Sequence, residues 1–485
     1  MKRCRALALF ALPAWLAACG GEEKPAAPAA PEGAAAAAET PASLPQGLLV
    51  ALSQFPVGPD GKAAAKPGPA RLEWVEREDG RWKTGAVEDP ESNVFHKALV
   101  FAPPGQPPAI LTLGGNAAAL QLWRLRDGAL VAQPIWKAEF GGKQNRMRDA
   151  EVGDILGDGT PAIAVATHDQ GVVALVTTKS DGGFDVRELD READTFVHEI
   201  ELGDLDGDGV IEIYATPSEP NKAGGGPQSG HVVRYVPQAK EGRTVVADLG
   251  NRHAKEILVE DVDGDGRDEL YVCVEAETEG SEQNVRIKVP VEVRRYDADT
   301  EPGAGTVVAT IDDRFCRFLT AGDVDGDGKK EMVAATFRAG VWLLEPGAAG
   351  QPWRKELVDR DSSSFEHAAL LVDLDGDGVD ELYVAADDQG ELRRYVWRDG
   401  KPVKETILRR RVPGSVLTWN LMAVPVALLS GEAAAAAPAP EGGATDAAAP
   451  ADGAADPLAP ASTAPEAEAP AGEAAPTPTA DGDAS

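Results

Sequence analysis

Basic residues are scarce in this sequence. Its 485 residues include 47 Lys and Arg against 80 Asp and Glu, which gives a formal net charge of -33 at pH 7. A surface of this sign repels nucleic acids and anionic lipid head groups, because their phosphates carry the same charge. We therefore expect no nucleic-acid partner, whereas cations, basic proteins and neutral glycans stay open as ligands.

Catalytic signatures are absent as well. The sequence has no nucleophile elbow, no phosphate-binding loop and no zinc-ligand spacing, and no Ser, His and Asp stand out as a triad. These absences favour a binding protein over an enzyme, although a reaction without a known motif stays open.

The N-terminal apolar run, Ala6 to Ala18, follows basic residues at positions 2, 3 and 5 and is too short to span a bilayer. This is the layout of a secretory signal. Leu16 to Cys19 resemble the lipobox of bacterial lipoproteins, in which the signal is cleaved before the cysteine and the cysteine is acylated. The resemblance implies a signal peptide over 1–18, a lipid anchor on Cys19 and an outer-membrane location, on either face. The alternative is an ordinary signal with a coincidental cysteine.

Two segments are too poor in apolar side chains to fold. Residues 20 to 46 are almost entirely Ala, Pro, Gly and Glu, and residues 431–485 are Ala, Pro, Gly and acid without one basic residue. Neither can bury enough surface to offset the entropy of ordering. We expect a tether over 19–46 and a disordered acidic tail over 431–485, with one folded domain, 47–430, between them.

An acidic motif recurs inside that domain. It has Asp at positions 1, 3 and 5, Gly at positions 4 and 6 and Glu at position 9, and full copies begin at Asp204, Asp261, Asp323 and Asp373. A degenerate copy begins at Asp154, and successive starts are 50, 57, 62 and 50 residues apart. Periods of this length are typical of stacked repeats and propeller blades.

The flanks of the motif predict β-structure. Short apolar runs precede and follow each copy, which indicates a hairpin, and further strands such as 390–397 and 403–408 complete each period. Four short strands in about fifty residues predict a propeller blade. One more blade is expected over 95–136. Another is expected from both termini, with inner strands in 417–429 and outer strands in 71–75 and 82–87, because closure removes free sheet edges. The predicted fold is an all-β, seven-bladed propeller, with six or eight blades as alternatives.

The acidic loops carry the donors of a calcium site. Their oxygens suit a hard cation, and several ligands on a flexible loop fit calcium better than magnesium. The expected ligands are the side chains of Asp204, Asp206, Asp208, Glu212, Asp261, Asp263, Asp265, Glu269, Asp323, Asp325, Asp327, Glu331, Asp373, Asp375, Asp377 and Glu381, with the backbone carbonyls of Val210, Arg267, Lys329 and Val379.

With its β flanks, the motif looks like the FG-GAP and VCBS repeats of integrin α-subunit propellers and bacterial surface proteins, closely over about 145–390. In that family the Asp and Glu side chains bind calcium, which implies about four Ca²⁺ sites here. The Asp154 copy departs from the pattern at Leu156 and Ala162, so calcium is not expected there. We expect the ion to stabilise hairpins, and the alternative is that the copies are plain Asp-Gly turns.

A cation precedes each acidic copy. Lys, Arg or His stands six residues before the first Asp, and a Lys takes the matching place in the first blade, giving Lys97, Arg148, His198, Lys255, Arg317 and His367. Six residues of strand place this position about 20 Å from the loop. Two interpretations stay open: a site for an anionic or polyhydroxyl ligand at the channel mouth, or ion pairs with acids of adjacent blades.

The function that these features predict is a cell-envelope lipoprotein whose calcium-stabilised propeller acts as a protein- or glycan-binding or adhesion module. The alternatives are a polysaccharide lyase or other enzyme that uses the cationic channel mouth, and a scaffold whose acidic tail recruits a basic partner.

Cys273 and Cys316 lie in neighbouring repeats, and a disulfide between them stays open because the sequence does not give their separation.

Overall fold

The computed structural model describes residues 44, 46–115, 117–141, 145–220, 227–239, 241–281, 284–347 and 351–429. The chain divides into two units, 1–39 and 40–485, and every described residue belongs to the second. The predicted signal peptide, Cys19, nearly all of the tether and the acidic tail lie outside the described residues. Within them, no helix has the length and apolarity needed to cross a membrane.

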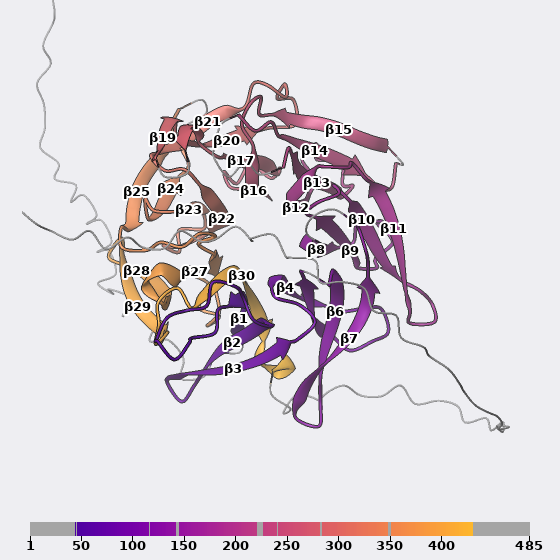
Figure 1. Cartoon of the computed structure of the whole chain (residues 1–485). Helices are drawn as coiled ribbons and strands as arrows, with labels where there is room; N and C mark the ends of the chain where they lie inside the picture. Colours follow the sequence, from indigo (N-terminus) through magenta and orange to yellow (C-terminus); the bar gives the residue numbers. More distant parts are fainter. Residues whose placement is uncertain are drawn as a thin grey trace, which may run out of the picture. The chain divides into compact units, whose positions relative to one another are not determined.

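The described residues form seven four-stranded antiparallel sheets arranged as the blades of a ring, with the first strand of each blade toward the centre (Figure 1). Blade 1 is β30 (Val416–Pro425), β1 (Gln46–Gln54), β2 (Ala70–Glu78) and β3 (Arg81–Asp89). Blade 2 is β4 (Phe95–Phe101), β5 (Ala109–Gly114), β6 (Ala119–Arg126) and β7 (Ala129–Lys137). Blade 3 is β8 (Met147–Gly153), β9 (Ala162–Thr167), β10 (Val173–Thr178) and β11 (Phe184–Asp190).

Blade 4 is β12 (Phe196–Gly203), β13 (Glu212–Ser218), β14 (His231–Val236) and β15 (Glu241–Asp248). Blade 5 is β16 (Ala254–Glu260), β17 (Glu269–Val274), β20 (Val291–Tyr296) and β21 (Thr306–Ile311), with an inserted hairpin of β18 (Glu277–Ser281) and β19 (Asn284–Val289). Blade 6 is β22 (Cys316–Gly322), β23 (Glu331–Thr336), β24 (Val341–Glu345) and β25 (Arg354–Asp359). Blade 7 is β26 (Ala369–Val372), β27 (Glu381–Ala386), β28 (Glu391–Arg398) and β29 (Lys401–Arg409), with the 3-10 turn η1 (Asp387–Gln389).

The predicted seven blades and their closure by both termini are confirmed. The prediction for the closing blade was wrong in one detail, since 417–429 supplies one inner strand, β30, followed by the 3-10 turn η2 (Val426–Leu428). The second strand is β1, which pairs with both β30 and β2. Residues 47–53 of β1 are buried, so the strand lacks the apolar-polar alternation that would have revealed it.

The cores lie between neighbouring sheets. Second strands such as β9 and β17 are buried along their whole length, whereas outer strands such as β7 are largely exposed. Tyr214, Tyr271 and Tyr383 on the second strands are fully buried. Cys273 and Cys316 are buried free thiols in the cluster that joins blades 5 and 6.

A β-bulge recurs on the innermost strands. The register with the second strand shifts at 95–97 in β4, 147–149 in β8, 197–200 in β12, 254–257 in β16 and 316–318 in β22. A bulge sets two residues against one on the partner strand and re-aims their side chains. Here the bulged residues are the cations that precede the acidic copies in the sequence, and their neighbours. The bulges therefore bring charged side chains into the channel.

Candidate functional site

The acidic hairpin loops share one conformation. In the first loop the Asp204 carboxylate accepts hydrogen bonds from the backbone N–H groups of Asp208 at 3.0 Å and Gly209 at 2.7 Å. The degenerate loop repeats both bonds, from Asp158 and Gly159 to Asp154. The Gly residues at positions 4 and 6 have positive φ in all five loops, which a side chain would disfavour. The first Asp and the two Gly therefore shape the turn even where the other carboxylates are missing.

Carboxylates converge in the four full loops. Oxygen atoms lie within 4.8 Å of one another in four groups: Asp204, Asp206 and Asp208; Asp261, Asp263, Asp265 and Glu269; Asp323, Asp325 and Glu331; Asp373, Asp375 and Asp377. The structure thus brings together thirteen of the sixteen predicted side-chain ligands and leaves Glu212, Glu381 and Asp327 outside their groups. All donors are oxygens, and each group could hold a divalent cation.

The Glu at position 9 lies under its loop. In blades 4, 5 and 7 a Tyr stands two residues after this Glu and donates its hydroxyl to it. The distance is 2.9 Å for Tyr271 to Glu269 and 3.2 Å for Tyr383 to Glu381. Burial raises the pKa of Glu269 and of Glu381 to about 7, against the lowering effect of neighbouring donors. Each Tyr is thereby a structural support for the loop, and its hydroxyl faces no solvent.

The sequence analysis did not predict an Arg on the third strand that contacts the acidic loop in three of the four blades. Arg234 Nη1 lies 3.2 Å from Asp206 and 2.7 Å from Glu212, and Arg394 Nη2 lies 3.4 Å from Asp375 and also pairs with Glu381. In blade 5, Arg295 makes the corresponding ion pairs with Asp263 at 2.5 Å and Glu269 at 3.2 Å. Each Arg lies opposite the supporting Tyr on the neighbouring strand. The available signal was an Arg-Tyr dipeptide in three third strands, at 234–235, 295–296 and 394–395.

The loop of blade 6 differs. Its register places Val333 opposite Leu343, where the other three blades have Tyr opposite Arg. Glu331 accepts a hydrogen bond from the backbone N–H of Val324 at 3.2 Å. The carboxylates at positions 1, 3 and 9 of this loop therefore converge beside apolar side chains.

The six predicted channel cations are all buried, at 1 to 8 % exposure. Lys97 lies 2.9 Å from Asp149 of the next blade and also pairs with Glu151. Arg317 bridges Glu275 of blade 5 at 3.1 Å and Glu366 of blade 7 at 2.6 Å. Arg148 reaches Glu366 from blade 3 at 3.4 Å, which joins two blades that are not neighbours. Burial would raise the pKa of Glu366, but Arg317 and Arg148 outweigh it and lower that pKa.

The cations enclose little space. Lys97, Arg148 and Arg317 line a cavity of about 20 Å³ together with His96, Asp149, Glu199, Phe318, Glu366, Trp419 and Asn420. That volume holds about one water molecule. The geometry favours the interpretation of these cations as ion pairs between blades over a ligand site.

The two predicted histidines are neutral at pH 7. Burial, reinforced by the charge of Lys255, holds the pKa of His198 well below its usual value. Neither ring nitrogen of His198 has a hydrogen-bond partner among the described residues. His367 is bonded to Ser362 at 2.8 Å and to the Thr336 carbonyl at 2.5 Å, and burial lowers its pKa to about 4.

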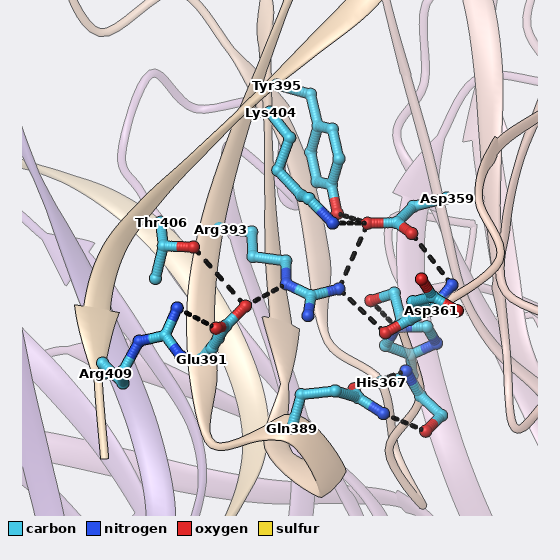
Figure 2. A network of polar contacts seen from close by, with 12 residues as sticks. Asp359, Asp361, His367, Gln389, Glu391, Arg393, Tyr395, Lys404, Thr406 and Arg409 are labelled. Carbon is cyan, nitrogen blue, oxygen red and sulfur yellow. Dashed lines mark hydrogen bonds and ion pairs between the residues drawn. The ribbon is translucent and has the colours of Figure 1, made fainter. Parts of the chain in front are cut away.

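A polar network also links the outer parts of blades 6 and 7 (Figure 2). Asp359, at the end of β25, accepts hydrogen bonds from Tyr395 at 2.6 Å and from Arg393 and Lys404 at 3.1 Å each. Burial would raise the Asp359 pKa, but the bonds from Tyr395 and Lys404 outweigh it and lower that pKa. This Tyr-Asp contact between blades recurs elsewhere in the ring.

Solved structures resemble this chain at low similarity. They include a lectin of Agrocybe aegerita, solved for its recognition of non-reducing terminal N-acetylglucosamine, with 16% identity, TM-score 0.44 and coverage of 77% of this chain and 98% of the lectin. The periplasmic gluconolactonase of Pseudomonas aeruginosa has 14% identity and a TM-score of 0.45, with coverage of 78% of this chain and 99% of the gluconolactonase. A protein of Lactobacillus plantarum has 9% identity and a TM-score of 0.49, with coverage of 78% of this chain and 99% of that protein. No family model and no curated protein matches the chain. The class of the protein, a seven-bladed β-propeller, is defined by its own strand pairing.

Proposed function

We propose that this chain is a lipoprotein of the bacterial cell envelope, built of FG-GAP/VCBS-like repeats, whose calcium-stabilised propeller binds a protein or glycan partner. The observation that carries a binding role is the closed channel. Its Lys97, Arg148 and Arg317 are ion-paired with buried acids, and its cavity of about 20 Å³ cannot admit a sugar ring or a peptide. A partner of this protein must therefore meet the blades from outside.

The calcium part of the proposal rests on the donor set. Three or four carboxylates converge in each full loop, and Asp375 Oδ1 is a buried atom without a partner among the described residues. A bound Ca²⁺ would supply positive charge there, in a medium where like charges otherwise repel. Extracellular modules of this kind bind calcium at roughly 10⁻⁴ to 10⁻³ M, which suits constant occupancy and a structural role.

The envelope part of the proposal rests on the sequence. The lipobox-like Leu16 to Cys19 would supply the anchor, and the Ala- and Pro-rich residues after it would hold the propeller away from the membrane. The acidic segment 431–485 supplies no base to attract nucleic acid or anionic lipid.

A screen of the whole lipidated protein, with calcium, tests this function. It should include a glycan array with neutral sugars and uronates, and cross-linking to envelope proteins in the native membrane. We expect saturable binding to one class of partner. Cleavage of a uronate polymer would replace the proposal with the lyase, and a partner that is lost on deletion of 431–485 alone would replace it with the scaffold.

A further inference from the structure

Blade interfaces repeat a Tyr-Asp contact. In blades 4, 5 and 7 a second Tyr directly follows the Arg that contacts the acidic loop. These residues, Tyr235, Tyr296 and Tyr395, pair with equivalent residues of the second strand and so occupy one repeat position. Tyr235 donates its hydroxyl to Asp190 of blade 3 at 2.7 Å, and Tyr395 donates to Asp359 of blade 6 at 2.6 Å (Figure 2). Both Asp side chains end the outer strand of the preceding blade.

Tyr296 breaks this pattern. Its side chain is 1 % exposed, and its O–H has no acceptor among the described residues, because the Arg294 guanidinium beside it can only donate. The equivalent acid, Asp248, instead accepts the Gly250 N–H at 2.9 Å and lies 3.7 Å from His231. A buried hydroxyl without a partner costs about 1–3 kcal/mol. This interface, between blades 4 and 5, therefore holds an unused donor.

A second departure occurs at the same interface. Just before the outer strand of blade 6 stands Trp353, whose ring packs 5.4 Å from Tyr271 of blade 5. Just before the outer strand of blade 5 stands Gly305, and a Cβ there would lie 2.2 Å from the ring of Tyr296. The Tyr296 ring thus covers a glycine where the next interface carries a large aromatic side chain.

Beside Tyr296 lies a cavity of about 200 Å³, ten times the volume of the channel cavity. Tyr296, Arg234 and Asp206 line it with Asp297, Thr244 and Thr300, over the apolar Leu205 and Val246. Arg234 Nε is a buried donor without a partner among the described residues. The walls therefore offer hydroxyl and guanidinium donors, carboxylate acceptors and an apolar surface.

We propose that this cavity binds one neutral sugar residue of a glycan. A sugar ring has hydroxyls that accept from Tyr296 and Arg234 and donate to Asp297, and its C–H face suits Leu205 and Val246. The one cation in the lining, Arg234, is already paired with Asp206 and Glu212, which disfavours a uronate. The proposal rests on the binding role proposed above and gives that role a site and a ligand class.

The test compares variants of one repeat position in the full chain with calcium. The probes are methyl glycosides of neutral hexoses and N-acetylhexosamines, with glucuronate and galacturonate, and binding is measured by ligand-observed NMR and calorimetry. Tyr296→Phe removes the hydroxyl whose O–H has no acceptor, so we expect about tenfold weaker binding of a neutral sugar with a Tm no lower than that of wild type. Tyr235→Phe and Tyr395→Phe, the matched controls, should keep the affinity and lower Tm.

Val245→Trp is a second variant. Val245 lines the cavity and is 39% exposed, so a large side chain there should fill the cavity without disturbing the core. We expect it to abolish sugar binding. Unchanged affinity in both Tyr296→Phe and Val245→Trp, or tighter binding of the uronates, overturns the proposal. Wild-type protein that binds a protein partner but no sugar overturns this site and leaves the binding function standing.

Discussion

Leu343 in blade 6 occupies the register position that Arg234 occupies in blade 4. The guanidinium of Arg234 contacts the carboxylates at positions 3 and 9 of its loop, whereas Leu343 is buried and offers no charge to the corresponding Asp325 and Glu331. Four loops of nearly one sequence thus fall into two classes, three with an arginine from the third strand and one with a leucine in its place.

Calcium removal should expose this difference. We expect hydrogen exchange of the loop at 323–331 to rise most when calcium is chelated, because no arginine offsets the repulsion of its carboxylates. The loops at 204–212, 261–269 and 373–381 should change less. Equal changes in all four loops would contradict a stabilising role for the three arginines.

Arg394→Met should be destabilising in calcium-free buffer. The Arg394 and Glu381 side chains are 4% and 3% exposed, and removing one partner of a buried ion pair costs about 3–5 kcal/mol. Calcium should restore part of this loss, as seen in chemical denaturation with and without the ion. The exposed Arg398 on the same strand is the control, and Arg398→Met should stay within about 0.5 kcal/mol of wild type.

Glu366→Gln should destabilise the ring without calcium dependence. The change leaves Arg148 and Arg317 facing a neutral amide in a buried site, so we expect a loss of several kcal/mol. Glu356→Gln, at a half-exposed ion pair on an outer strand, should cost less than 1 kcal/mol. A wild-type Tm for Glu366→Gln would restore a ligand-binding interpretation of the channel cations.

Acid should weaken the fold through its buried histidines. Burial lowers the pKa of His168 and His367 to about 4 and that of His198 well below 6.5, so the unfolded chain binds more protons between pH 6.5 and 4. The free energy of unfolding that these histidines contribute is fully present above pH 6.5. It is lost as the pH falls from 6.5 to about 4. His198→Phe should flatten this dependence at little cost at pH 7, because the ring makes no hydrogen bond to a described residue. An unchanged pH slope would argue against this origin, and the partly exposed His231→Phe is the control.

Cys19→Ala should release the protein from the membrane. The lipobox-like segment predicts acylation of Cys19, so this variant lacks the predicted lipid anchor. Membrane fractionation, with mass spectrometry of the N-terminal peptide, checks this. A variant that stays in the membrane fraction would contradict the lipid anchor.

The sequence alone determined the class of architecture, although it did not reveal strand β1. The strict spacing of Asp and Gly specifies hairpins, and the four-strand period groups them into sheets. A row of such sheets closes into a ring because closure leaves no exposed edge strand with unpaired backbone groups. The loop geometry was equally local, since the first Asp and the Gly at positions 4 and 6 form the turn through hydrogen bonds within six residues.

Only the tertiary structure decided which charges meet. The sequence placed Lys97, Arg148 and Arg317 in one ring, but bulges turn them onto Asp149, Glu275 and Glu366 from other blades. Likewise the spacing could not show that Arg234 reaches its loop across a strand pair, or that a cavity lies beside Arg234 and Tyr296. Turn formation depends on neighbours along the chain, whereas ion pairs and cavities depend on residues that only the closed ring brings together.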